Sequence, residues 1–119
     1  MEDPAELIAD HLSDKVRAAI SEDFVRHVME AKLAEAIVLC EKQAAYGPHN
    51  IGRPPNGIAP EVALVIRIND KVQRLGTLLS QGVAVPAGSE VRADSWGDIA
   101  NYGTIGGLVE AGLWPGVTR

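Results

Sequence analysis

The amino-acid sequence predicts a single all-α domain with four main helices. Apolar residues recur at steps of three and four over long stretches, which is the spacing of a helix with one buried face. Capping residues precede these stretches, and glycine or proline follows most of them. No segment keeps a strand register, because the strand-like composition of residues 62–68 belongs to a longer helical pattern. We therefore treat residues 1–119 as one domain.

The first predicted helix covers about residues 4–20. Asp3 is its expected N-cap, Pro4 its first helical residue and Glu6 the partner of Asp3 in a capping box. The apolar positions of this helix are Leu7, Ile8, Leu12 and Val16.

The second predicted helix, about residues 22–45, is the longest. Ser21 is its expected N-cap, and acidic residues follow in the first turn, where the helix dipole favours negative charge. Neither Gly nor Pro occurs between Ser21 and Gly47. Residues 47–60 then hold four Pro and three Gly, which predicts a loop long enough to bind a ligand.

Two more helices are expected, from Glu61 to about Gly82 and, after Ser89 as N-cap, over about residues 90–110. Each glycine inside the last helix would cost about 1 kcal/mol relative to alanine. We therefore expect another helix or a ligand to approach this helix closely at its four glycines, Gly97, Gly103, Gly106 and Gly107.

Composition and charge exclude several classes of function. The net charge is −5 and no basic run exceeds two residues, which argues against binding to duplex nucleic acid. A single cysteine excludes a disulfide within the chain and a cysteine-rich zinc site. We expect a cytoplasmic protein without a membrane span. A chain this short buries only about two thirds of its unfolded surface, which favours a homo-oligomer, a dimer or larger.

Charged residues lie together on the third and fourth predicted helices. Asp70, Lys71 and Arg74 share one face of the third helix with Arg67. On the fourth, Asp94, Asp98 and Asn101 follow the spacing i, i+4 and i+7. Carboxylate and amide oxygens are the ligands that Mg²⁺ prefers, so a magnesium site is one interpretation. The other is a solvated helix face with an ion pair between Asp70 and Arg74.

The end of the second predicted helix carries a cation and a ring on one face. Lys42 lies one turn before Tyr46, and Asn50 follows in the same segment, KQAAYGPHNIG. A cation and a flat ring beside a loop suit a phosphate and a base. Alternatively, Tyr46 only packs over the helix end.

The order of three segments resembles a known family. KQAAYGPHNIG, RINDKVQRLGTLL and ADSWGDIANYGTIGGLVEAGLW follow one another as in the nucleotide-modification-associated domain family of phages and bacteria. That family is related to the all-α nucleoside triphosphate pyrophosphohydrolases of the MazG and dimeric dUTPase type. The resemblance covers about residues 24–115. It implies a four-helix, MazG-like bundle and Mg²⁺-dependent hydrolysis of a nucleoside triphosphate to a monophosphate and pyrophosphate.

The resemblance also implies roles for particular residues. Asp98 matches the last metal-binding aspartate of the pyrophosphohydrolases, Asp94 an acid one turn earlier, and Asp70 the first glutamate. Gln73 or Arg74 stands where a second glutamate is expected, so the metal site is incomplete unless Glu41 supplies a carboxylate. The expected catalytic and metal-binding residues are thus Asp70, Asp94 and Asp98, with Glu41 as a further metal ligand. The expected substrate-binding residues are Lys42, Tyr46, Asn50, Lys71, Arg74 and Asn101.

The sequence therefore predicts a Mg²⁺-dependent nucleotide-binding protein that acts as a nucleoside triphosphate pyrophosphohydrolase. Two alternatives stay open. One is a module that binds a nucleotide or a modified nucleotide without hydrolysing it, and the other is a helical interaction protein.

Overall fold

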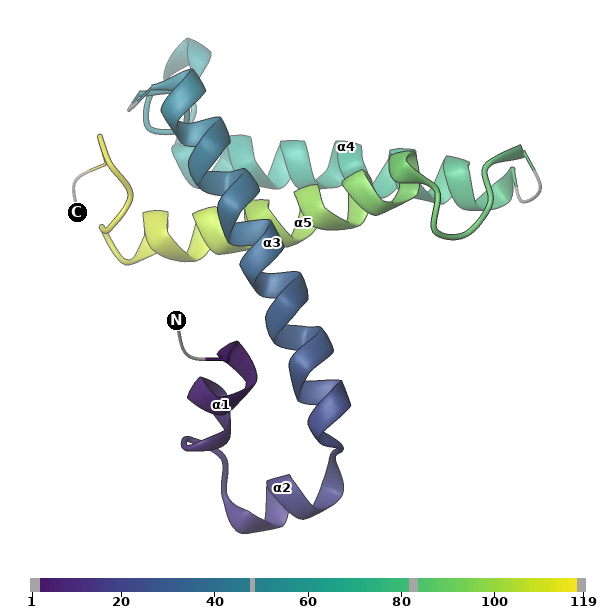
Figure 1. The fold of residues 1–119 in the computed structure, drawn as a ribbon. Coiled ribbons are helices and arrows are strands. Elements are labelled where there is room, and N and C mark those ends of the chain that lie inside the picture. Colours follow the sequence, from purple (N-terminus) through teal and green to yellow (C-terminus); the bar gives the residue numbers. More distant parts are fainter. Residues whose placement is uncertain (1–2, 48, 82–83, 118–119) are drawn as a thin grey trace. The chain divides into compact units, whose positions relative to one another are not determined.

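The computed structural model describes residues 3–47, 49–81 and 84–117 (Figure 1). This part of the chain holds helices and no strand, which confirms the all-α prediction. None of its helices combines the length and the apolar character that crossing a membrane requires. Contacts divide the chain into two compact units, Met1–Val38 and Leu39–Arg119.

Two short helices begin the first unit, α1 (Pro4–Ala9) and α2 (Asp14–Ala19). Asp3 caps α1 as predicted, since its side chain accepts a hydrogen bond of 3.0 Å from the Ala5 amide. The prediction of one helix over residues 4–20 is wrong. Ser13 has an extended backbone, and its hydroxyl accepts a hydrogen bond from the Val16 amide, so a second helix begins there.

The long helix α3 (Glu22–Tyr46) belongs to both units, because the division falls after Val38. Its predicted N-cap is confirmed: the Ser21 hydroxyl accepts a hydrogen bond of 3.0 Å from the Phe24 amide. The helix ends before Gly47, whose φ of 84° lies in the left-handed region that glycine adopts without strain.

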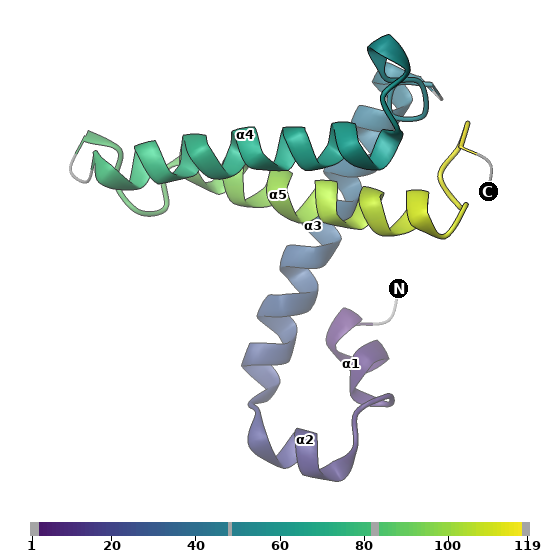
Figure 2. The same cartoon turned by 180° about the vertical axis from the view of Figure 1, so that it is seen from behind.

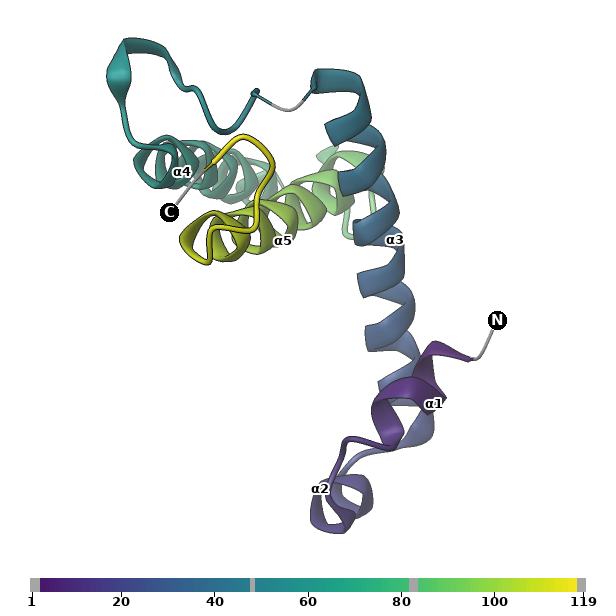
Figure 3. The same cartoon turned by 90° about the vertical axis from the view of Figure 1, so that its left-hand side faces the viewer.

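After α3, the second unit contains an irregular segment with the short 3₁₀ turn η1 (Pro55–Gly57) and the helices α4 (Pro60–Ser80) and α5 (Glu90–Glu110). Helices α4 and α5 pack side by side (Figure 2), and Figure 3 shows the irregular segment between α3 and α4. The part of the chain that the structure describes holds five α-helices rather than the four predicted, because the first one is split.

The core of the second unit is built from segments far apart in sequence. Ile51 comes from the irregular segment, Leu64 from α4, Ile105 and Val109 from α5, and Trp114 from the tail. Val109 is completely buried. The core therefore ties the irregular segment and the tail to the pair of helices α4 and α5.

The glycines of α5 do not mark a close approach within one chain. A Cβ atom added at Gly97, Gly103, Gly106 or Gly107 would meet no heavy atom of the described residues within 4 Å. The expected approach of a neighbouring helix is therefore wrong for the chain by itself. A close approach occurs instead at Gly52, where an added Cβ would lie 3.0 Å from the Gly116 carbonyl oxygen.

Candidate functional site

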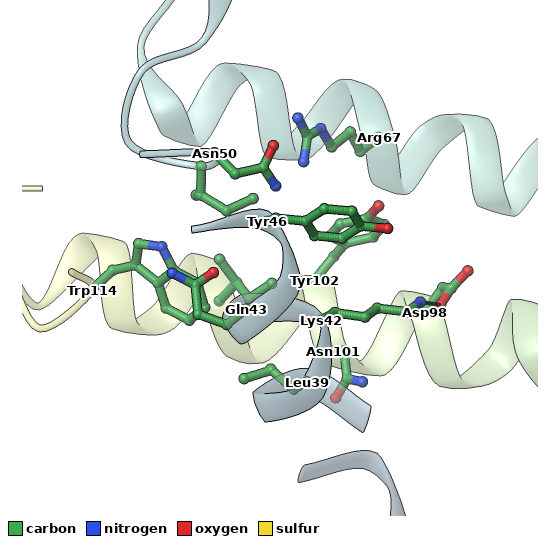
Figure 4. Close-up of a pocket in the computed structure, with 12 residues that line it drawn as sticks. Leu39, Lys42, Gln43, Tyr46, Asn50, Arg67, Asp98, Asn101, Tyr102 and Trp114 are labelled. Atoms are coloured by element: carbon green, nitrogen blue, oxygen red, sulfur yellow. Dashed lines mark hydrogen bonds and ion pairs between the residues drawn. The ribbon is translucent and has the colours of Figure 1, made fainter. Parts of the chain in front are cut away.

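A cleft in the second unit gathers residues from three helices, the irregular segment and the tail (Figure 4). It encloses about 530 Å³, part of which is open to solvent. One face of α3 and one face of α5 form most of its wall, each through residues spaced i, i+3, i+4 and i+7. From α3 these are Leu39, Lys42, Gln43 and Tyr46; from α5 they are Asp98, Asn101, Tyr102 and Ile105. Arg67 of α4, Asn50, Ile51 and Trp114 complete the lining.

Asp98 joins three helices through two ion pairs. Lys71 of α4 places its Nζ 2.9 Å from Oδ2 of Asp98, and Lys42 of α3 places its Nζ 3.2 Å from Oδ1. The Asp98 side chain is 19% exposed, whereas that of Lys42 is 50% exposed. The carboxylate of Asp98 is therefore already engaged by two ammonium groups. Asp98, Lys42 and Lys71 are together named the Asp98 cluster.

The two ion pairs shift the pKa values of their members. Burial alone would raise the pKa of Asp98, but the hydrogen bonds from Lys71 and Lys42 outweigh it and hold that pKa below its ordinary value. The hydrogen bond to Asp98 raises the pKa of Lys42 despite partial burial, and the nearby hydroxyls of Tyr46 and Tyr102 raise it further. At neutral pH the carboxylate is thus ionised and Lys42 is positively charged.

Arg67 is the cation of the cleft whose charge no acid compensates. It is half-buried, and no residue in the described ranges forms a hydrogen bond or an ion pair with its guanidinium. Three cations, Lys42, Lys71 and Arg67, stand against the single carboxylate of Asp98, so the local charge is +2. A positively charged cleft on a chain of net charge −5 is suited to an anion.

Aromatic rings form the other part of the cleft. Tyr46 is 63% exposed, Tyr102 is half-buried and Trp114 is 4% exposed. The buried Nε1 of Trp114 has no hydrogen-bond partner in the part of the chain that is described. Trp114 and Asp98 lie at opposite ends of the view in Figure 4, so the cleft has an apolar end and a charged end.

The structure brings together six of the ten residues that the sequence selected. Those that line the cleft are Lys42, Tyr46, Asn50, Asp98 and Asn101, and Lys71 joins them through its ion pair with Asp98. Four others are exposed and do not line the cleft: Glu41, Asp70, Arg74 and Asp94.

The acids selected for Mg²⁺ do not gather around one point. Among residues 3–47, 49–81 and 84–117, no group of three or more His, Cys, Asp or Glu side chains is placed to hold a metal ion. Asp98, the acid that does line the cleft, has its two oxygens on Lys42 and Lys71. In this arrangement the carboxylates do not fit a magnesium ion.

Several lining residues were not selected from the sequence. Gln43 lies three residues before Tyr46 and Tyr102 lies four residues after Asp98, so helical periodicity puts each on a face that the sequence had already indicated. Arg67 was placed on the charged face of its helix but was given no role. Trp114 had no such signal, because its position depends on how the tail folds back onto the core.

Comparisons with models of protein families, with curated proteins and with solved structures find no match for this chain.

Proposed function

We propose that the second unit binds a nucleotide in the cleft, with the base against the tyrosines and the phosphate against the cations. One observation carries the proposal: the exposed ring of Tyr46, the half-buried ring of Tyr102 and the uncompensated Arg67 line the same cleft (Figure 4). Tyrosine rings stack on bases of any sequence. An arginine offers five N–H donors in a planar fork that matches phosphate oxygens.

The local charge supports the same proposal. Because the whole chain is acidic, a phosphate would be repelled from most of its surface. Lys42, Lys71 and Arg67 reverse the sign at the cleft. The family resemblance of the three sequence segments also favours a nucleotide ligand and a MazG-like arrangement of helices.

Mg²⁺-dependent hydrolysis of a nucleoside triphosphate is the second candidate. It is favoured by the resemblance of the three sequence segments to the family related to the pyrophosphohydrolases, and not by the present arrangement of the carboxylates. We place binding without hydrolysis first, because the carboxylate of Asp98 is engaged by two lysines.

Thermal unfolding with and without nucleotides tests the proposal. A ligand at 100 times its Kd adds about 2.7 kcal/mol to the free energy of unfolding. We expect stabilisation by a nucleotide in EDTA, without added Mg²⁺. Pyrophosphate release on adding Mg²⁺ would instead establish the second candidate. Absence of stabilisation by any common or modified nucleotide would contradict both and favour a helical interaction protein.

Tyr46→Leu tests the position of the base. Losing one stacked ring should weaken nucleotide binding by about tenfold, because stacking on one base contributes about 1–3 kcal/mol. The melting temperature should change little, since Tyr46 is 63% exposed. Trp96→Leu is the matched control: Trp96 is 57% exposed on α5 and does not line the cleft. Equal affinity in the Tyr46 variant would assign this ring to packing alone.

Association of copies of the chain is proposed as well. Large apolar side chains on α3 and α4 are half exposed, including Phe24, Ile37 and Val65. Burial of such side chains between copies would stabilise a dimer or a larger assembly. Sedimentation at micromolar concentration that finds only a 12.6 kDa species would contradict it.

A further inference from the structure

We infer that the cleft takes a ligand with a single phosphate, a nucleoside monophosphate, in preference to a triphosphate. This inference rests on the proposed nucleotide site and specifies its ligand. The number of phosphates follows from the charges that line the cleft and from those that lie beyond its charged end.

The charges in and beside the cleft match one phosphate. Lys42, Arg67 and Asp98 line the cleft, Lys71 is paired with Asp98 without lining it, and the four charges sum to +2. A phosphate monoester carries about −1.5 to −2 at pH 7, so one such group neutralises the cleft. Each further phosphate would add negative charge that no cation lining the cleft balances.

The next charges along the two helices do not favour a longer chain of phosphates. Asp94 lies one turn before Asp98 on the same face of α5, about 6 Å farther along the helix axis. Asp70 and Arg74 flank Lys71 on α4. All three are exposed, and together they carry one net negative charge. A triphosphate extended past the Asp98 cluster would therefore meet like charge.

The opposite end of the cleft is suited to a base. Ile51, Ile105 and Trp114 are buried there and carry no charge. This uncharged, partly aromatic wall suits the planar ring of a base rather than a further phosphate.

Calorimetric titration with matched ligands tests the inference. The ligands are the nucleoside, its monophosphate and its triphosphate in the adenosine, guanosine, cytidine and thymidine series. Each ligand is titrated once in EDTA and once in Mg²⁺. We expect the monophosphate of the preferred base to bind at least about tenfold more tightly than its nucleoside, as for a charged hydrogen bond. The triphosphate in EDTA should bind no more tightly than the monophosphate.

Three variants locate the phosphate. Arg67→Gln should lower monophosphate affinity by about tenfold, towards that of the nucleoside. Arg74→Gln is the matched control, because it removes the same charge from the same helix outside the cleft, and it should leave the affinity unchanged. Asp94→Asn should raise triphosphate affinity in EDTA several-fold without changing monophosphate affinity. A melting curve for each variant confirms that it is folded.

Two results would overturn the inference. If Mg²⁺ makes the triphosphate the tightest ligand and Asp94→Asn abolishes this increase in affinity, the ligand is a metal triphosphate. That result would contradict the preference for a monophosphate but would agree with the proposed nucleotide binding. If no nucleoside or nucleotide in the four series binds, both the preference for a monophosphate and the proposed nucleotide binding are contradicted.

Discussion

The two units of the chain are both rich in apolar residues but bury them very differently. In the second unit, the irregular segment, α4, α5 and the tail enclose a core in which Leu64 is 3% exposed and Val109 is fully buried. Among the described residues of the first unit, Ala5 is the one buried side chain. The first unit instead leaves large apolar side chains 37–55% exposed: Leu7, Val16, Phe24, Val28, Leu33, Ile37 and Val38.

This difference shows that helical periodicity alone does not produce a core. Helices α1 and α2 have six residues each, too few to cover the part of α3 in their unit. Helices α4 and α5 have 21 residues each and pack along their length. The second unit therefore holds the larger buried core, and the cleft lies beside that core.

The largest expected effect compares one apolar residue from each unit. Leu64→Ala removes a buried side chain and should lower the free energy of unfolding by about 2–5 kcal/mol. Ile37→Ala removes a side chain that is 51% exposed and should cost less than about 1 kcal/mol. Denaturant unfolding followed by circular dichroism measures both. Equal losses would mean that a second copy covers Ile37.

Asp98→Asn gives a smaller effect within the second unit. Because Asp98 accepts bonds from Lys42 and Lys71, its neutralisation should destabilise the chain by about 1–2 kcal/mol. Asp94→Asn is the control on the same helix and should stay within about 0.5 kcal/mol, since Asp94 is exposed. A gain in stability for Asp98→Asn would show that repulsion among the acids outweighs the two lysine bonds.

The same cluster predicts a dependence of stability on pH. The pKa of Asp98 is lowered in the folded chain, so its contribution is present above the unfolded pKa of about 3.9 and is lost as pH falls through the folded value. The pKa of Lys42 is raised, so its contribution is present below about pH 10.4 and is lost as pH rises through the folded value. The stability difference between wild type and Asp98→Asn should be constant from pH 6 to 9 and should shrink below about pH 4. A difference that persists at low pH would contradict this account.

The smallest effect compares the N-caps of two helices. Ser21→Ala removes a bonded cap of α3 and should cost about 1 kcal/mol. Ser89 stands at the N-cap of α5, but its hydroxyl is buried and has no partner among the residues described. Ser89→Ala should therefore cost less than Ser21→Ala or be neutral. Thermal unfolding of the two variants under the same conditions shows which substitution lowers the stability more.

Much of the fold could be predicted from local signals. The bounds of α5 and the cap of α3 follow from Ser89, Ser21 and the spacing of apolar residues. The apolar pattern does not predict the break between α1 and α2, although Ser13 followed by Asp14 is itself an N-cap signal. An N-cap signal is only about two or three residues long. Here the apolar spacing continues past it and, by itself, predicts one uninterrupted helix.

The site could be predicted only in part. Helical spacing puts Lys42 and Tyr46 on one face of α3 and Asp98 and Asn101 on one face of α5, and all four line the cleft. Which charges meet across helices is a tertiary property, and spacing along one helix does not determine it. Asp98 accordingly meets lysines of α3 and α4 rather than the acids Asp70 and Asp94.

The contrast between the two tryptophans has an optical consequence. Trp96 is 57% exposed, whereas Trp114 is 4% exposed in the core beside the cleft. In the Trp96→Phe variant, the remaining indole gives an emission spectrum that reports the interior alone. A shift of this emission to longer wavelength marks the entry of solvent into the core. Resistance of the fluorescence to a dissolved quencher measures how rarely the core opens. The chain thus carries its own probe, placed where the cleft and the core meet.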